Sequence, residues 1–454
     1  QASERSPTVR SLKELRQHNV VLQQWELSCA AAALATILRY QYGVPVTERS
    51  VALGLIDRTE YIENPDLVRI RQGFSLLDLK RYVDALGYDG VGLGQLAFSD
   101  LLARAPIIVP VTLGGKTYSF LLTTTLPRTA IDPSLREHLG KPKEYYDVTK
   151  DGVTTRVPIF YAPDAKIAKG LTLKTGGVVV LRDFQKIREI TGLDIRGMIG
   201  MSFLRQYTIR IDFDRGLLDF YKALPPNAAP KEFGSMLKVT FHKELPFLPG
   251  ELFGRTLPFL MHLSYPGSGM LEKNLFTGYL KSGKIKKTKL TMLELAGGTH
   301  RSIMGRIPSF SLKTVGTFTN LLFDSGQGNF LGLGFFRRFN LTLDFPNGRL
   351  FFAPSKQFRV EDQADMSGLH LRSTRKKSEA ETVYIEAVAK GSPAEAAGLK
   401  SGDVLIKINS QNILDYTLAA IRNFLKSKPS QRVELVFRRG KKLYKTSFLL
   451  KKQI

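Results

Sequence analysis

Hydrophobic and polar positions follow two different patterns along the chain. After Ser28, a residue type that caps helices well, residues 29–40 form an alanine- and leucine-rich run that predicts a helix. From about residue 112 to residue 356, short β-rich runs are separated by turn signals such as Asp214-Arg215-Gly216. The sequence therefore predicts a helical N-terminal part followed by a long strand-rich region.

The strand-rich region contains an internal repeat. Residues 199–205 recur as residues 331–337, so that Gly200 and Gly332 hold the same place 132 residues apart. The match continues in register to Asp212 and Asp344, and both copies show the period-two alternation of a strand, a turn and a second strand. We interpret the repeat as a duplicated β-rich lobe, and two lobes that face each other form a cleft.

Proline-rich and polar stretches divide the chain further. Pro225-Pro226-Asn227 and Pro230 mark a linker in the middle of the strand-rich region, and the polar residues 361–365 open a final unit. We therefore predict an α+β multidomain protein. Its predicted parts are an N-terminal tail at 1–16, a helical part at 17–111, β-rich lobes at 112–226 and 233–356, and a final unit at 362–454.

The chain is strongly basic. Its 454 residues include 66 Lys and Arg against 41 Asp and Glu, for a formal net charge of +25. The basic residues are spread along the chain, and their two local clusters lack the interleaved aromatic residues of single-strand binders. We therefore expect no specific nucleic-acid partner. Solvated surface charge is one interpretation, and attraction to an anionic envelope surface or an acidic partner is the other.

Other features of the composition exclude whole classes of protein. No apolar run reaches the ~18 residues of a transmembrane helix. A single cysteine excludes an internal disulfide framework and a cysteine-based zinc site, and we expect neither metal nor cofactor. The chain begins with Gln1 rather than Met, as a secreted protein does after removal of its signal peptide, although a trimmed chain would begin in the same way. We therefore expect a periplasmic or extracellular protein.

The repeat resembles the closing half of each lobe in retropepsin-like aspartic proteases. In that family a segment of two hydrophobic residues and a glycine closes the lobe, here residues 198–200 and 330–332. The resemblance implies a bilobal pepsin- or retropepsin-like unit in which each lobe carries an Asp-Thr/Ser-Gly loop. Here Thr123-Thr124-Thr125 and His262-Leu263-Ser264 stand at those places, and the aspartate is absent from both.

The missing aspartates decide the expected chemistry. The aspartic mechanism needs two carboxylates that share one proton. Thr123 cannot act as a base near neutral pH, and His262 alone is not a dyad, so we expect the two residues to face each other across a non-catalytic cleft. Asp324-Ser325-Gly326 comes too close to the closing Leu331-Gly332 to be the catalytic loop and is interpreted as a turn. Asp132 is likewise interpreted as a turn acid before Pro133.

Residues 17–111 resemble the double-glycine leader peptidases, papain-like cysteine peptidases that trim bacteriocin precursors. The match rests on Gln23, Gln24, Ser28 and Cys29 before the alanine-rich helix, and on residues 73–82. It implies a papain-like fragment in which Cys29 is the nucleophile and Gln23 the oxyanion donor. A helix N-terminus would favour the thiolate.

The histidine that this family places on a later strand is missing. The strand that should carry it reads Thr117-Tyr118-Ser119-Phe120, His18 precedes the cysteine, and His138 lies in the first lobe. Either the site is inert, or residues between about 111 and 118 are missing from this sequence. A third interpretation makes Cys29 a small buried residue at the start of a helix.

The last ~90 residues resemble a PDZ domain of the bacterial secreted-protease type. Residues 367–371 match the carboxylate-binding loop, although His370 replaces the usual second glycine, and residues 391–409 match densely. The resemblance implies a groove, walled by residues 417–426, that binds an extended segment. Its candidate residues are Gly368, Leu369, His370, Leu371, Ile421 and Leu425. Nearby basic residues would favour acidic segments, namely Arg372, Arg375, Lys376 and Lys377. The alternative is a domain that serves only for packing.

These observations lead to one main hypothesis and two alternatives. The main hypothesis is a secreted or periplasmic protease homologue that binds peptides or proteins through the bilobal cleft and the PDZ groove without cleaving them. The first alternative is an active cysteine peptidase that uses Cys29 and Gln23, with the PDZ domain recruiting substrate. The second is a structural subunit of an envelope assembly.

Overall fold

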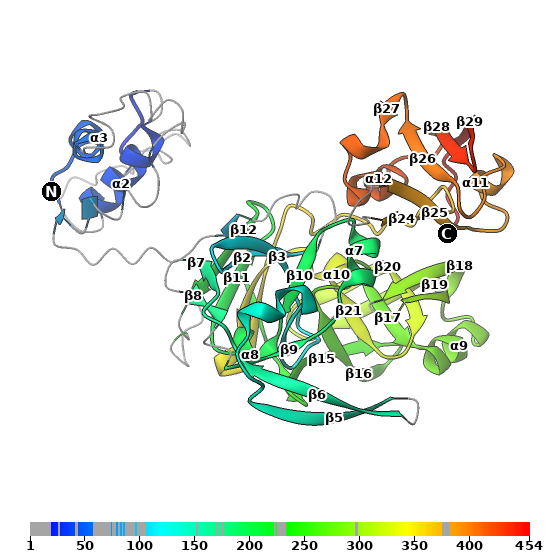
Figure 1. Cartoon of the computed structure of the whole chain (residues 1–454), viewed down its shortest axis with the longest axis horizontal. Helices are drawn as coiled ribbons and strands as arrows, with labels where there is room; N and C mark the ends of the chain where they lie inside the picture. Colours follow the sequence, from blue (N-terminus) through cyan, green and yellow to red (C-terminus); the bar gives the residue numbers. More distant parts are fainter. Residues whose placement is uncertain are drawn as a thin grey trace, which may run out of the picture. The chain divides into compact units, whose positions relative to one another are not determined.

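The structure is a computed structural model of the whole chain (Figure 1). It divides the chain into two compact units, Gln1–Gly92 and Leu93–Ile454. The predicted tail at 1–16, His18 and most of residues 73–82 lie outside the described residues. The structure describes residues 20–25, 28–40, 44–57, 106–150, 153–168, 177–221, 233–295, 298–374 and 382–454, and the shorter pieces 74, 79, 82–83, 85–86, 96–97, 171–173 and 224.

The described part of the first unit is built on two helices, α2 (Cys29–Tyr40) and α3 (Glu48–Ile56). The run of alanines and leucines forms α2, as its helix propensity predicts. A capping box starts α3, because the Thr47 side chain accepts from the Ser50 amide and the Ser50 side chain accepts from the Thr47 amide. Apolar residues of both helices form one small core, with Ala31, Ala35, Leu38, Val51 and Leu55 buried.

The first lobe of the second unit is a nine-stranded sheet with the order β5-β6-β9-β4-β10-β3-β2-β7-β8. Gly114-Gly115, both with positive φ, connect β2 to β3, so the predicted boundary at residue 111 falls inside β2. The strands are β2 (Ile108–Leu113), β3 (Lys116–Leu122), β4 (Thr129–Ile131), β5 (Glu144–Lys150), β6 (Val153–Tyr161), β7 (Lys166–Ala168), β8 (Leu171–Thr172), β9 (Val178–Leu181) and β10 (Ile195–Ile199).

The second lobe repeats this strand order. Its sheet runs β15-β16-β21-β17-β20-β19-β18, which corresponds strand for strand to β2-β3-β10-β4-β9-β6-β5, and β14 is added at its edge. In both lobes the strand that leads to the repeated glycine is parallel to one neighbour and antiparallel to the other. The duplication predicted from the 132-residue offset is therefore confirmed in the strand order. The strands are β14 (Thr240–His242), β15 (Leu245–Leu252), β16 (Arg255–His262), β17 (Gly269–Glu272), β18 (Lys286–Leu295), β19 (Gly298–Leu312), β20 (Gly316–Gly326) and β21 (Phe330–Gly332).

The repeated closing segments join the lobes through one shared sheet. After short helices α8 (Met201–Leu204) and α10 (Leu333–Phe336), each copy forms a hairpin, and the two hairpins pair antiparallel through β11 and β22. The repeated aspartates, Asp212 and Asp344, are buried and hold the turns of their hairpins through Arg215 and Arg349. The six strands of this sheet are β1 (Leu96–Ala97), β11 (Thr208–Asp212), β12 (Leu217–Tyr221), β13 (Ser235–Lys238), β22 (Phe339–Asp344) and β23 (Arg349–Pro354).

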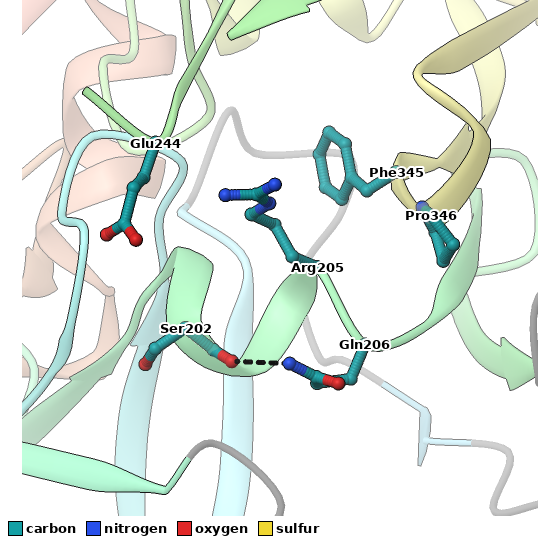
Figure 2. Close-up of a pocket in the computed structure, with 6 residues that line it drawn as sticks. All are labelled: Ser202, Arg205, Gln206, Glu244, Phe345 and Pro346. Atoms are coloured by element: carbon teal, nitrogen blue, oxygen red, sulfur yellow. Dashed lines mark hydrogen bonds between the residues drawn. The ribbon is translucent and has the colours of Figure 1, made fainter. Parts of the chain in front are cut away.

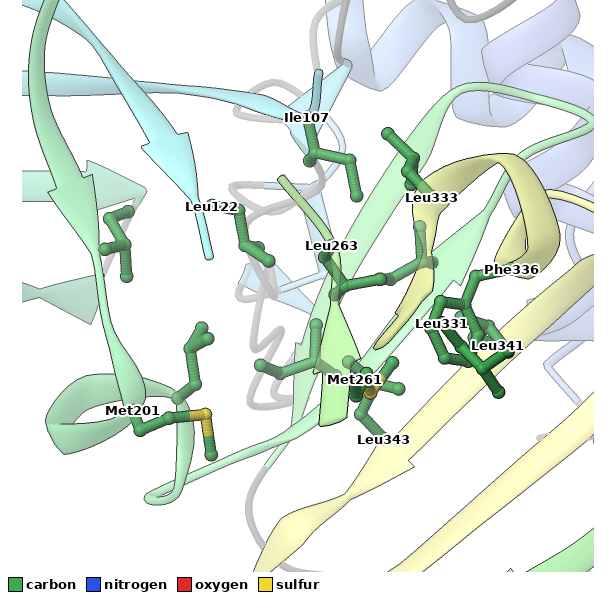
Figure 3. Close-up of a cluster of buried hydrophobic side chains, with 14 of the residues drawn as sticks. Ile107, Leu122, Met201, Met261, Leu263, Leu331, Leu333, Phe336, Leu341 and Leu343 are labelled. Atoms are coloured by element: carbon green, nitrogen blue, oxygen red, sulfur yellow. The ribbon is translucent and has the colours of Figure 1, made fainter. Parts of the chain in front are cut away.

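One hydrophobic core runs through both lobes and the shared sheet. Leu122 and Met201 of the first lobe belong to the same buried cluster as Met261, Leu263 and Leu331 of the second (Figure 3). Burial of apolar surface contributes about 25 cal/mol per Å², so this continuous core is the main force that holds the lobes together. The junction between the two lobes is therefore filled by packed apolar side chains, which form the floor of this region.

The C-terminal part has its own sheet, with β24 at its edge, and its own core. A hairpin turns at Gly440, since Arg439 pairs with Lys442. Its elements are β24 (Leu369–Thr374), β25 (Thr382–Val388), α11 (Pro393–Ala396), β26 (Val404–Ile408), β27 (Gln411–Asn412), α12 (Leu418–Phe424), β28 (Arg432–Arg439) and β29 (Lys442–Leu449).

The architecture as a whole is multidomain and strand-rich. Helices are few among the described residues, so the expected α+β class is supported only loosely. No described helix is both long enough and apolar enough to span a membrane.

Candidate functional site at the junction of the two lobes

Two loops meet where the lobes join, one after β3 and one at the end of β16. The Thr124 hydroxyl, which is completely buried, donates a hydrogen bond of 2.5 Å to the Met261 carbonyl and accepts one of 3.3 Å from the Leu263 amide. The Thr123 amide donates to the Ile199 carbonyl on β10 at 3.0 Å. These bonds fix the first loop against its own sheet and the two loops against each other.

The side chains at the two predicted aspartate positions come together through a third residue. Thr123 Oγ1 lies 2.9 Å from Ser264 Oγ, and Ser264 Oγ lies 3.3 Å from His262 Nδ1. Thr123 Oγ1 also lies 2.9 Å from Thr125 Oγ1. The structure thus places Thr123 and His262 in one chain of hydrogen bonds made of hydroxyls and an imidazole. Ser264, the link between them, was named from the sequence only as part of the segment His262-Leu263-Ser264 and not as a site residue.

This cluster is electrically neutral near pH 7. Burial lowers the pKa of His262 to about 4, because the charged imidazolium is poorly solvated there. The ring centroid lies 5.3 Å from that of Phe330 and 5.8 Å from that of Tyr265, which accounts for the apolar surroundings. A neutral imidazole and three hydroxyls can exchange hydrogen bonds with a bound amide, but they hold no carboxylate proton to transfer.

The two other aspartates considered from the sequence have structural partners. Asp132 caps the short helix η2 (Pro133–His138), as expected of a turn acid, and also binds Arg188 Nη1 at 2.6 Å. Burial alone would raise the pKa of Asp132, but hydrogen bonds from Arg188 and Ser134 outweigh it, and the pKa is lowered.

The interpretation of Asp324 as a turn residue is wrong. Asp324 lies within β20, paired with both β17 and β19, because the strand continues to Gly326. It is buried and accepts a hydrogen bond from the Tyr265 hydroxyl. Burial raises the pKa of Asp324 to about 6, although the Tyr265 hydrogen bond, Lys426 and Lys289 act in the opposite direction.

In the first unit, Cys29 is the first residue of α2 and its side chain is exposed, which corrects the interpretation as a buried residue. The Gln23 side chain donates to the Trp25 carbonyl at 2.8 Å. No sequence motif pointed to Glu48, which accepts from the Ser28 hydroxyl and, at 2.8 Å, from the Gln24 amide. No histidine occurs among the described residues of this unit.

The candidate residues of the C-terminal groove serve largely as core. Leu369, Leu371, Ile421 and Leu425 are buried in the core of that part, and burial lowers the pKa of the half-buried His370. Their role as binding pockets stays a prediction.

Two local features of this groove bear on its candidate residues. Gly368 has φ of +81°, and a Cβ there would lie 2.2 Å from the Ser392 side chain, so the loop requires glycine. Arg372 is buried and ion-paired with Glu386 at 2.7 Å. The expectation that Arg372 attracts an acidic ligand is therefore wrong. Residues 375–377 lie outside the described residues.

A separate cavity of about 440 Å³ lies at another point of the lobe junction (Figure 2). Ser202, Arg205 and Gln206 from the first lobe and Glu244, Phe345 and Pro346 from the second line it. The Arg205 guanidinium lies between the Glu244 carboxylate and the Phe345 ring (Figure 2). None of these residues was a candidate from the sequence. Within the described ranges, no group of three or more His, Cys, Asp or Glu side chains could hold a metal ion.

Comparison with known proteins identifies one of these parts. A family model described as a PDZ domain matches residues 384–439. The chain carries a C-terminal PDZ domain. This match lies within the predicted unit at 362–454 and confirms that part of the sequence-based interpretation.

Two curated relatives are each described as a probable functional amyloid protease, FapD. The protein from Pseudomonas aeruginosa is 38% identical over 117 residues, which cover 26% of this chain and 50% of the relative. The protein from Pseudomonas fluorescens is 40% identical over 107 residues, covering 24% and 45%. The chain thus spans about half the length of the curated relatives that it matches, and it is related to proteins named as proteases.

Among solved structures, a photosystem II D1 C-terminal processing protease is 20% identical, covering 21% of this chain and 26% of its own, with a TM-score of 0.19. That score is too low to support an argument about fold or function.

Proposed function

We propose that the two lobes form a retropepsin-like unit that binds an extended peptide or protein segment without cleaving it. The observation that carries the proposal is the hydrogen-bonded chain of Thr123, Ser264 and His262 at the two positions where an aspartic protease has its carboxylates. Support for the retropepsin-like assignment comes from the shared strand order and from the Thr124 hydrogen bonds between the two loops.

The chemistry of the cluster favours binding over hydrolysis. Activation of water needs a base, and protonation of the scissile carbonyl needs an acid of matched pKa, each contributing about 10²–10⁴-fold in rate. A threonine hydroxyl does not ionise near neutral pH. His262, with its pKa lowered to about 4, is a weak base that is held neutral. Backbone amides of a bound segment could instead exchange hydrogen bonds with Ser264 and His262.

The test is a parallel measurement of binding and cleavage. A library of unstructured decapeptides is incubated with the full chain, bound peptides are recovered and identified by mass spectrometry, and products are sought with and without pepstatin. We expect capture without cleavage, and weaker capture by Ser264→Val. The control is Thr240→Val, an exposed position on β14. Pepstatin-sensitive cleavage that Thr123→Val abolishes would contradict the proposal.

A second candidate function is a cysteine peptidase in the first unit. Two observations favour it, the exposed Cys29 at the start of α2 and the protease names of the relatives. Because Cys29 is the chain's single cysteine, labelling by a peptide probe that ends in Gly-Gly and carries a thiol-reactive group reports on it alone. Labelling much faster than that of free cysteine, and lost in Gln23→Ala, would support a nucleophile. Labelling at the rate of free cysteine would reject it.

The PDZ domain indicates binding of a peptide or protein. We place the protein, with its net charge of +25, in the periplasm or outside the cell, against an anionic envelope surface or an acidic partner. Salt-sensitive association with vesicles of anionic lipid, absent with neutral lipid, is the measurement that tests the envelope surface.

A further inference from the structure

The ligand edge of a PDZ domain is the strand that follows its carboxylate-binding loop, and the resemblance of residues 367–371 to that loop makes β24 this strand. It lies at the end of its sheet and pairs only with β25 on one side. The Ile385 amide and carbonyl, opposite Leu371 in the register, both bond to residues 402–403 on the far side. In an antiparallel pair this arrangement turns the Leu371 amide and carbonyl away from β25 and toward the free edge.

That edge is in contact with the first lobe. Helix α7 (Gln185–Thr191) packs along β24, and the two elements lie near each other in Figure 1. Arg422 of α12, the opposite wall of the groove, bridges them. Its Nη2 donates to the Leu371 carbonyl at 2.6 Å and its Nη1 donates to the Ile190 carbonyl at 2.8 Å. The carbonyl that a bound strand would use therefore already accepts a charged donor.

The carboxylate-binding loop is also engaged from within the chain. The Asp365 carboxylate accepts from the Gly368 amide at 2.6 Å and from the Ser367 amide at 3.0 Å. The Leu369 amide donates to the Ser367 hydroxyl at 3.0 Å. An internal carboxylate and an internal hydroxyl thus hold amides at the start of the loop in which a ligand's terminal carboxylate would be bound.

Helix α7 is itself firmly attached to the first lobe. Arg188 donates to the buried Asp132 at 2.6 Å and to the Ile195 carbonyl at 3.1 Å. The N-cap residue of the helix is the fully buried Phe184, and its C-cap residue is Gly192, which has the left-handed conformation. A contact between α7 and β24 therefore ties the PDZ domain to the sheet that carries Thr123.

We propose that α7 occupies the ligand edge of the PDZ domain, so that an extended peptide can pair with β24 only by displacing α7 and the Arg422 bridge. The occupied edge stands on the contacts alone, whereas its competition with a peptide rests on the peptide-binding role proposed above. Because coupling is reciprocal, a peptide that pairs with β24 loosens α7, and loosening α7 improves peptide binding.

Hydrogen exchange of the full chain, followed by mass spectrometry, tests the occupied edge. Arg422→Ala removes both bridging bonds, and we expect exchange about tenfold faster in residues 185–191 and 369–374 together. Arg432→Ala on β28, an exposed arginine of the same domain, is the control and leaves both segments unchanged. Faster exchange in 369–374 alone, or in neither segment, overturns the inference.

A second variant covers the case in which Arg422→Ala disturbs the folding of the PDZ domain. Arg188→Ala detaches α7 from Asp132 and changes no residue of the PDZ domain, and we expect it to accelerate exchange in 369–374. Unchanged exchange in that segment overturns the inference.

An array of immobilised decapeptides with free C-termini tests the competition. We expect Arg422→Ala to capture more peptide than the wild type and the Arg432→Ala control. Equal capture by wild type and Arg422→Ala rejects competition. Capture by none of them, with exchange accelerated in both segments, upholds the occupied edge and rejects the peptide-binding role of the domain.

Discussion

Replacing Thr124 by valine tests whether the two loops are locked together by hydrogen bonding. Valine has nearly the same shape but neither donor nor acceptor, so the variant keeps the packing and removes the bonds to the Met261 carbonyl and the Leu263 amide. All three groups lie in the buried floor of the junction. A buried polar group left without its partner costs about 1–3 kcal/mol.

We therefore expect Thr124→Val to lower the free energy of unfolding of the lobes by about 1–3 kcal/mol. For units of this size each kcal/mol shifts the melting temperature by roughly 2–4 °C. Urea denaturation gives the free energy, and hydrogen exchange of residues 261–264 shows whether the loss is local. The matched control is Thr240→Val, since the Thr240 hydroxyl is exposed and makes only a long bond of 3.4 Å to the Phe247 carbonyl.

A Thr124→Val protein as stable as the control, with unchanged exchange in residues 261–264, would refute the reasoning. It would mean that core packing alone holds the two loops in place, and that the hydrogen bonds of the Thr124 hydroxyl contribute nothing to the free energy of unfolding.

The remaining predictions concern titration and anchoring. The pKa of Asp324 is raised to about 6, so its protonated carboxyl stabilises the folded state, and this stabilisation is lost as pH rises from about 4 to 6. Asp324→Asn removes about 3 kcal/mol of this pH-dependent loss of stability, which urea midpoints measured across pH report. His262, whose pKa is lowered to about 4, contributes stability that is lost as pH falls from 6.5 toward 4, so His262→Gln flattens the profile in the opposite sense by about 3 kcal/mol. A pH profile that neither variant changes would contradict both assignments. Asp132→Asn weakens the buried pair with Arg188 and lowers the thermal midpoint by several degrees, whereas Asp183→Asn, at an exposed position just before α7 that also pairs with Arg188, does not.

The sequence predicted what is periodic or repeated. That the two lobes share one strand order followed from a repeat that keeps Gly200 and Gly332 in register, and the structure explains those glycines. A Cβ at Gly200 would lie 2.5 Å from the Arg128 carbonyl oxygen, and one at Gly332 would lie 2.1 Å from the Gly267 carbonyl oxygen. Close approach of two backbones leaves a signature in one residue type, and such a signature is visible in a sequence.

The interactions that the sequence did not predict join residues far apart in the chain. Ser264 meets Thr123 across 141 positions, and Arg422 meets Ile190 across 232. Asp324 resembled a turn because its neighbours are Ser325 and Gly326, but strand pairing on both sides overrode that local preference. No period or motif marks such pairs, because each depends on which strands the fold places side by side.

The two loops contribute to the lobe junction in different ways. In the first lobe the Thr124 hydroxyl donates a hydrogen bond to the loop of the second lobe. The equivalent residue of the second lobe, Leu263, has no hydroxyl and is buried in the shared core. One loop therefore holds the junction by hydrogen bonds and the other by apolar packing. A catalytic aspartate pair requires two carboxylates about 3 Å apart that share one proton, and neither loop supplies one. A binding floor has no such requirement, and a junction stabilised in two different ways can remain rigid while Ser264 and His262 meet a neutral ligand.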